Sequence, residues 1–91
     1  MKINDIVTVV AVTGAEYVGK FKKETDDTFV IGDPHIVSPV NETIQFMPTV
    51  AMTGMPSIGE VTFQKSGVIL LVPTAKEVAN EYTKSISGII L

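Results

Sequence analysis

A glycine placed inside an apolar strand pattern is the feature that most constrains the fold of this chain. Residues 6–12 are nearly all β-branched and predict a strand, and Thr13-Gly14-Ala15 predicts a hairpin to a second strand. In that second strand Tyr17, Gly19 and Phe21 share one face, because side chains alternate along a strand. Glycine weakens a strand unless the backbone bends or packs closely there. A small closed barrel needs such a bend, and an ordinary bulge in another β-protein is the alternative.

A tight turn and a charge-free strand form a second informative block. Residues 60–64 alternate apolar and polar side chains and predict a strand. Lys65-Ser66-Gly67 predicts a tight turn in which Gly67 supplies a positive φ. Val68–Val72 follows without a charge, and it predicts a strand that is buried on both faces or lies at a sheet edge. An uncharged apolar edge invites association with another chain.

The segment between the two blocks predicts further strands and turns. Residues 24–27 predict a polar turn, and a third strand is expected over residues 28–31. Residues 32–34 interrupt that strand before it resumes. His35 follows this interruption, which favours a turn-stabilising role for its side chain.

The stretch after the third strand is rich in methionine. Residues 39–42 predict a turn, and residues 44–52 are apolar on both parities, which predicts a strand covered on both sides. Met47, Met52 and Met55 lie in this stretch. They either fill the barrel interior or form a surface for a partner, because methionine adapts to irregular surroundings.

The apolar period changes from two residues to about four after Pro73, which predicts a C-terminal helix over about residues 75–87. Thr74 and Glu77 predict a capping box with Thr74 as the N-cap. The apolar helix face is formed by Val78, Tyr82 and Ile86. Gly88 is the predicted stop. We expect this helix to pack across one end of a barrel.

The order and spacing of the two blocks resemble the Sm-like (LSm) family of small, ring-forming, RNA-binding barrels. Residues 14–21 match the G-x-x-x-x-G-x-apolar core of the family's first motif, and residues 63–67 match its second motif. The resemblance covers roughly residues 5–37 and 60–73. It implies an all-β fold, a small and strongly bent five-stranded barrel of the Sm-like or SH3-like type, here with one C-terminal helix.

The resemblance also implies which residues bind RNA. In the family, the loop before the third strand offers an Asp and an Asn to a base, and a basic residue of the second motif lies near the pore. The matching positions here are Asp26, Asp27 and Thr28 in the first loop and Lys65, Ser66 and Gly67 in the second. Ser66 stands where the family usually has Arg.

The resemblance further implies a homo-oligomer. In the family, the last strand pairs with a neighbour's preceding strand, and repetition closes a ring, which we expect to hold about five to seven subunits. The candidate interface residues are Val68, Ile69, Leu70, Leu71, Val72, Met47 and Met52.

The net charge of the chain limits how it can bind nucleic acid. Ten acidic residues stand against seven lysines and no arginine, for a formal net charge of −3. Nonspecific binding of nucleic acid depends on clustered positive charge. Any contact with RNA must therefore be local and carried by a few lysines and backbone groups.

The amino-acid composition of the chain also argues against an enzymatic function. The chain has no cysteine and a single histidine, His35, so it lacks the usual ligands of a transition-metal site. It also lacks a phosphate-binding glycine loop and the context of a nucleophile triad. We expect no enzymatic activity, no metal and no cofactor. With no targeting core and no apolar stretch of membrane length, residues 1–91 are expected to form a single cytoplasmic domain without membrane contact.

Two functions from different classes fit these observations. The first is a ring that binds single-stranded RNA in or near a central pore. The second is a ring-shaped scaffold for protein interactions that keeps the Sm fold without binding RNA, because fold does not imply function. The positions of the two blocks favour the first function, whereas the negative charge and the missing arginine favour the second.

Overall fold

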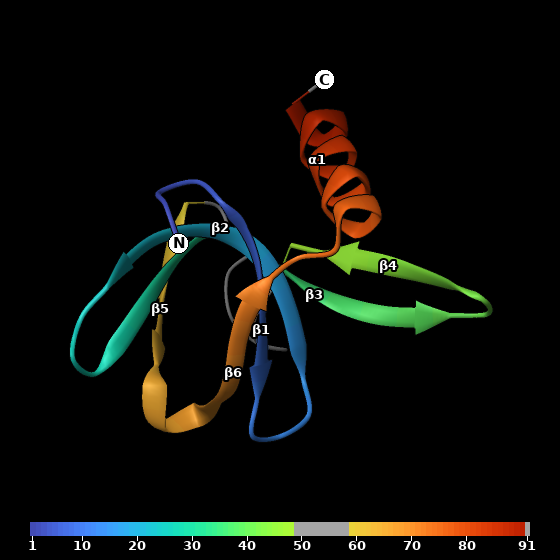
Figure 1. The fold of residues 1–91 in the computed structure, drawn as a ribbon. Helices are drawn as coiled ribbons and strands as arrows, with labels where there is room; N and C mark the ends of the chain where they lie inside the picture. The colour runs from blue at the N-terminus through green and yellow to red at the C-terminus, as the bar shows by residue number, and fades with distance from the viewer. Residues whose placement is uncertain (49–58, 91) are drawn as a thin grey trace.

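Six strands, a short 3₁₀ turn and a helix form the part of the chain that the computed structural model describes. It describes the backbone of residues 1–48 and 59–90, and the side chains of residues 1–48 and 59–86. In chain order the elements are β1 (Ile6–Ala11), β2 (Glu16–Glu24), β3 (Thr28–Val40), β4 (Thr43–Met47), β5 (Glu60–Gln64), η1 (Lys65–Gly67), β6 (Val68–Pro73) and α1 (Lys76–Ile90). The fold is mainly β with a C-terminal helix, as predicted (Figure 1).

The sheet bends into a barrel because β3 pairs with different strands along its length. The strand order is β4-β3-β2-β1-β6, and all pairings are antiparallel. The first half of β3, Thr28–Gly32, also pairs with β5, whereas the second half, Ile36–Val40, pairs with β4. Five strands, β1, β2, β3, β5 and β6, thus surround the core. The second half of β3 and β4 form a two-stranded arm that projects from this barrel (Figure 1).

Gly19 lies at the bend that the sequence predicts. The register between β2 and β3 shifts between Val18 and Lys20. A Cβ atom on Gly19 would lie 2.5 Å from Cγ2 of Ile31 and 2.9 Å from the carbonyl oxygen of Gly32. A larger residue therefore cannot fit unless β3 moves, and the absence of a side chain lets the two strands approach while the sheet curls.

The core lies inside the barrel, and the face of β2 that Tyr17 and Phe21 share is turned toward it. Its buried members are Val7, Val9, Tyr17, Phe21 and Ile31. Phe63 of β5 packs against them, and its ring contacts Tyr17 edge to face at a centroid distance of 5.3 Å. The alternation of β1 and β2 places one set of their apolar residues on this inner face, whereas Val18 is buried on the other face of β2. Burial of apolar residues is the main stabilising contribution in a domain of this size.

The interruption predicted at residues 32–34 is a bend within a continuous strand. Asp33 has a left-handed backbone with φ of 48°, which Asp tolerates better than most residues do. Its N–H donates to the carbonyl oxygen of Gly59 at 2.8 Å, and its carboxylate accepts from Gly59 N–H at 2.9 Å. These two hydrogen bonds pair the polar groups of Asp33 at the bend. The strand β3 then continues in a new direction into the arm.

The prediction of a strand covered on both sides over residues 44–52 is wrong for its described part. β4 ends at Met47, and the side chains of Ile44 and Met47 are exposed. The reason is that β4 is one of the two strands of the arm. The arm projects away from the barrel, so the core does not cover it. Met52 and Met55 lie outside the described residues.

The ends of α1 differ from the prediction. The carbonyl oxygen of Ala75 accepts the N–H of Ala79 at 2.8 Å, so Ala75 rather than Thr74 is the N-cap. Thr74 still belongs to the sheet end, because its hydroxyl lies 2.9 Å from that of Thr8 in β1. At the other end the helix continues past Gly88. Glycine ends a helix where the chain turns left-handed, and here the backbone stays helical.

Tyr82 anchors α1 to the bend of β3. Its side chain is fully buried, and its hydroxyl donates to the carbonyl oxygen of Asp33 at 2.7 Å. Its ring meets His35 and Phe46 edge to face. Nδ1 of His35 lies 2.9 Å from the same Asp33 oxygen, which is the predicted turn-stabilising role. The helix therefore lies between the barrel and the arm rather than across one barrel end (Figure 1).

Candidate nucleic-acid interface

The loop between β2 and β3 lies beside the turn between β5 and β6. The N–H of Lys65 donates to the carbonyl oxygen of Asp27 at 2.8 Å, and Thr28 pairs with Gln64 across the sheet. The structure thus brings together the two predicted sets of RNA-contacting residues: Asp26, Asp27 and Thr28 with Lys65, Ser66 and Gly67.

Thr25 orders the first loop. Its hydroxyl accepts the N–H groups of Asp27 at 3.3 Å and Thr28 at 3.0 Å. It also lies 2.6 Å from the hydroxyl of Thr28. The side chains of Asp26 and Asp27 are exposed, so the predicted polar turn is confirmed. The loop is held in one conformation by local bonds, which leaves its two carboxylates directed to solvent.

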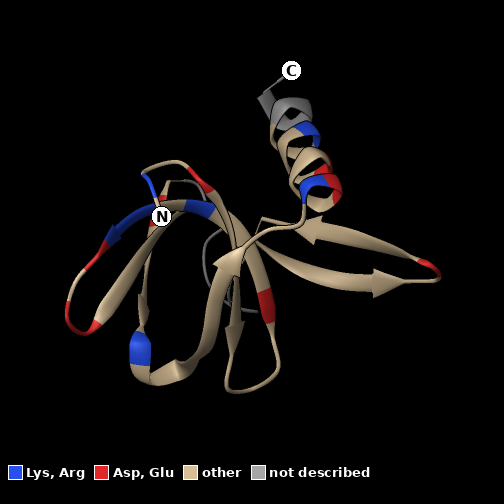
Figure 2. Cartoon of the chain, viewed as in Figure 1, with Lys and Arg blue, Asp and Glu red and all other residues tan. Residues whose placement is uncertain are grey.

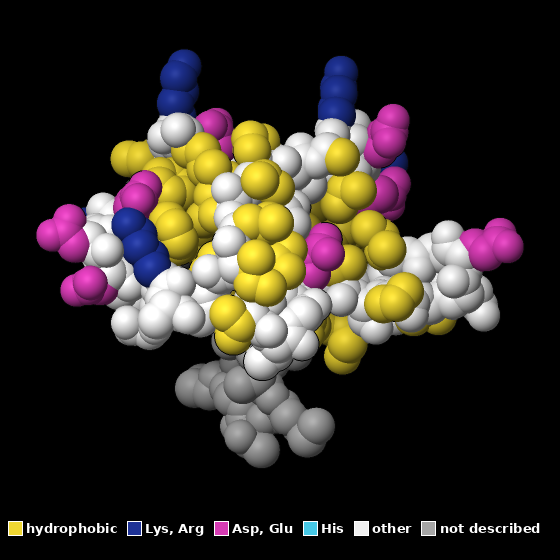
Figure 3. Space-filling view, turned by 60° about the horizontal axis from the view of Figure 1, so that its bottom comes forward, with side chains coloured by type: hydrophobic (Ala, Val, Ile, Leu, Met, Phe, Trp, Pro, Cys, Tyr) yellow, Lys and Arg dark blue, Asp and Glu magenta, His cyan; other side chains and the backbone are white. Residues whose placement is uncertain are grey.

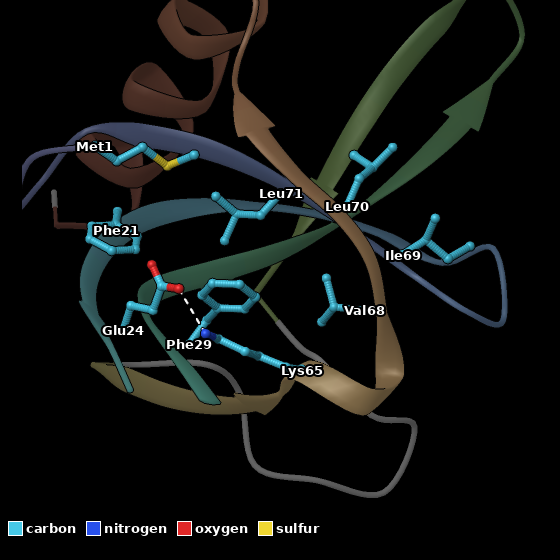
Figure 4. Close-up of a pocket in the computed structure, with 9 residues that line it drawn as sticks. All are labelled: Met1, Phe21, Glu24, Phe29, Lys65, Val68, Ile69, Leu70 and Leu71. Atoms are coloured by element: carbon cyan, nitrogen blue, oxygen red, sulfur yellow. Dashed lines mark hydrogen bonds and ion pairs between the residues drawn. The ribbon is translucent and has the colours of Figure 1, made fainter. Parts of the chain in front are cut away.

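Lys65 is paired within the chain. Its Nζ atom lies 2.7 Å from Oε2 of Glu24 and 5.0 Å from the centre of the Phe29 ring. The Lys65 side chain is 30% exposed and that of Glu24 is 53% exposed. The predicted phosphate contact is therefore already occupied by a carboxylate and an aromatic face in this structure (Figure 4).

A cavity of about 450 Å³ adjoins this ion pair, between β6 and the end of the β2–β3 hairpin (Figure 4). Its lining includes Phe21, Phe29, Val68 and Leu71. The side chains of Val68 and Leu71 point toward the cavity, whereas those of Ile69 and Leu70 point away from it (Figure 4). The strand β6 thus packs one set of side chains against the core and exposes the other set on the surface.

The prediction of a positive φ at Gly67 is wrong. Among the described glycines, Gly14 and Gly59 have positive φ angles and Gly67 does not. Lys65–Gly67 forms a 3₁₀ turn, in which φ is negative throughout. Ser66 is exposed at the middle of this turn.

The predicted interface strand lies at a sheet edge. Within the described ranges, β6 pairs with β1 alone and β5 pairs with β3 alone. Ile69, Leu70 and Val72 are exposed, and one face of the molecule carries a broad band of hydrophobic side chains (Figure 3). Met47 lies on β4, at the opposite end of the strand order from β6, and Met52 is not among the described residues.

The charge of the interface is acidic. Residues 24–28 and 65–67 contain three carboxylates and one lysine. Figure 2 shows acidic residues along the β2–β3 loop and a basic residue at the turn that precedes β6. Attraction of phosphate at these loops therefore depends on Lys65 and on backbone N–H groups.

Within residues 1–48 and 59–86, no group of three or more His, Cys, Asp and Glu side chains is arranged to hold a metal ion. No described helix is both long and apolar enough to span a membrane.

Glu24 and Phe29 are the site residues that sequence reasoning missed. They are cross-strand partners on either side of the loop, so their side chains share a face and both reach Lys65. The predicted polar turn over residues 24–27 included Glu24, whereas β2 extends through Glu24, so the prediction did not pair it with Phe29. The contact of Glu24 with Lys65 was not evident either, because the two residues lie 41 positions apart.

No protein-family model matches this chain, and no curated protein resembles it in sequence at a significant level.

Proposed function

We propose that this chain assembles into a ring of identical, Sm-like subunits and binds single-stranded RNA at the two adjacent loops. In this proposal β6 of one subunit pairs with β5 of the next, and repetition closes a ring of about five to seven subunits. The two strand edges without a partner in the described chain support it, as does the uncharged surface of β6.

The observation that carries the RNA-binding proposal is the contact between the two predicted loops. The Lys65 N–H bond to Asp27 places a cation, a hydroxyl and two carboxylates at one end of the barrel. Lys65 and backbone N–H groups would contact phosphate, whereas Asp27 and Thr28 would contact base edges. A ring would repeat this arrangement around its axis. The lysines, one from each subunit, would together produce a local region of positive electrostatic potential.

Lys65→Ala tests the proposal directly. Fluorescence anisotropy with uridine-rich and adenine-rich single strands, across a range of salt, measures affinity and its salt dependence. We expect Lys65→Ala to weaken binding and to reduce the salt slope by about one for each Lys65 that contacts phosphate. Lys84→Ala is the matched control, because Lys84 is an exposed lysine on α1.

Two results would contradict the proposal. Binding of wild type and Lys65→Ala with equal affinity and equal salt dependence would remove Lys65 from the site. Failure of the wild-type protein and of the Lys84→Ala control to bind either strand at low salt would exclude these loops as an RNA site in the native protein.

A second function is favoured by the pairing of Lys65 with Glu24. If that pair is permanent, the interface offers carboxylates and no free lysine, which suits a ring-shaped scaffold for protein interactions. This function predicts an oligomer by light scattering together with no RNA binding at any salt concentration.

A further inference from the structure

Glu24 and Phe29 form a binding site for an ammonium group, and Lys65 of the same chain occupies it. The two residues are paired across the β2–β3 hairpin, and their side chains therefore lie next to each other on one face. The carboxylate contacts Nζ of Lys65 at 2.7 Å, and the aromatic ring lies 5.0 Å from it. Carboxylates and aromatic faces both attract cations, so the two contacts act together.

The backbone of Lys65 is fixed independently of its side chain. Its N–H group is bonded to Asp27, and the 3₁₀ turn begins at this residue. The Lys65 side chain is partly exposed at the edge of the cavity. The side chain can therefore leave Glu24 by rotating about its own bonds, without any rearrangement of the fold.

We infer that Glu24 is an internal competitor for RNA phosphate, and that Lys65 must exchange Glu24 for phosphate when RNA binds. This inference rests on the proposed function and adds a regulatory residue to it. Glu24 would make binding weaker and more selective, because a ligand that offers a single weak anion does not displace the carboxylate. Several phosphates on one strand would do so together at successive subunits.

The exposure of the ion pair makes the exchange feasible. Ion pairs between exposed side chains change an equilibrium by at most about fivefold. Phosphate contacts by a lysine are of similar or greater strength and gain from the release of counterions. The competition is therefore close to balanced, and removal of Glu24 should have a measurable effect.

Glu24→Gln is the decisive variant, since it keeps the shape of the side chain and removes its charge. We expect it to raise RNA affinity by about two- to fivefold for each Lys65 engaged. Glu60→Gln is the control for net charge, because Glu60 is an exposed carboxylate on β5 outside the predicted RNA-contacting residues. Both variants remove one negative charge, and a general reduction of repulsion would affect them equally.

The same substitution in a Lys65→Ala background completes the test. We expect Glu24→Gln to have no more effect there than Glu60→Gln has, because no ammonium remains to be released. Equal gains from Glu24→Gln and Glu60→Gln in the wild-type background, or no gain from Glu24→Gln, would overturn the inference.

The inference and the proposed function fail in different ways. Loss of affinity in Lys65→Ala without a gain in Glu24→Gln supports RNA binding at Lys65 and rejects the competitor. Binding by Glu24→Gln alone supports competition by Glu24 and rejects RNA binding by the native protein. No binding by any variant rejects both.

A spectroscopic measurement follows the exchange itself. The ε-methylene protons of Lys65 lie near the Phe29 ring and experience its ring current. When a single-stranded oligonucleotide is added to the wild-type protein, we expect their NMR signals to move toward those of a solvent-exposed lysine. Unchanged signals at saturating oligonucleotide would show that Lys65 stays with Glu24.

Discussion

At the scale of single residues, Gly19 of the first motif and Gly67 of the second have different physical roles. Gly19 is required because a Cβ atom there would lie 2.5 Å from Ile31 and 2.9 Å from a backbone oxygen. Gly67 has no atom within 4 Å of the position of a Cβ, and its φ angle is not left-handed. A motif match alone therefore cannot distinguish a glycine that is sterically required from one that is not.

Gly19→Ala should destabilise the protein, because the added methyl group must displace β3. We expect a loss of about 1–3 kcal/mol in the free energy of unfolding, which is typical of overpacking a core. Gly67→Ala is the control and should change that free energy by less than about 0.5 kcal/mol. Urea denaturation followed by circular dichroism measures both, and equal losses would contradict the assigned roles.

At the scale of elements, the bend in β3 determines where the arm and the helix lie. Asp33 turns the strand, and its carbonyl oxygen receives both Tyr82 and His35. The helix is thereby attached to the same point at which the arm leaves the barrel. Because α1 is anchored through Tyr82, the ionisation state of that phenol should control how firmly the helix is held.

Tyr82 should make stability sensitive to alkali. Burial, followed by the nearby Asp33 carboxylate, raises the pKa of Tyr82 above its ordinary value near 10. The neutral phenol is thus favoured in the folded state, so its stabilising contribution is complete below about pH 10 and is lost as the pH rises further. Urea titrations of the wild type between neutral pH and about pH 11 should show this loss.

Tyr82→Phe separates this effect from the titration of other groups. Removal of the hydroxyl should cost about 1 kcal/mol at neutral pH, because one buried hydrogen bond is lost. Above about pH 10 the variant should lose less further stability than the wild type does, since its ring cannot ionise. Parallel pH dependence of the two proteins would show that the pKa of Tyr82 is the same in the folded and the unfolded state.

At the scale of the whole molecule, the barrel is open in the part of the chain that the structure describes. β5 and β6 each have a single partner strand there, and the outer side of β6 is apolar. Such an edge promotes pairing with another chain. The arm is also apolar and exposed, but it lies at the other end of the strand order.

Leu70→Lys tests whether β6 forms the contact between subunits. In the proposed ring a lysine at this edge would be buried beside the neighbouring strand, so we expect the variant to form smaller species than the wild type does. Ile44→Lys is the matched control, because Ile44 and Leu70 are 40% and 41% exposed and Ile44 lies on the arm. Light scattering at micromolar concentration distinguishes the two variants. A monomeric wild type, or dissociation by Ile44→Lys alone, would contradict this assembly.

The sequence by itself determined the local elements of this protein. Alternation and β-branching predicted β1, β2, β5 and β6, Gly14 predicted the first hairpin, and Gly19 predicted the bend. The spacing of Val78, Tyr82 and Ile86 predicted the helix. These features depend on sterics and on the side-chain period within a few residues, so a short window of sequence contains them.

The tertiary structure alone decided the environment of the site, and it decided which apolar segments are buried and which are exposed. Lys65 is paired with Glu24 because the fold brings the ends of β2 and β5 together. β4 is exposed because β3 bends away from the core, and α1 packs beside that bend because Tyr82 finds a carbonyl oxygen there. Each outcome depends on which distant segments become neighbours, and the residues of one segment do not contain that information.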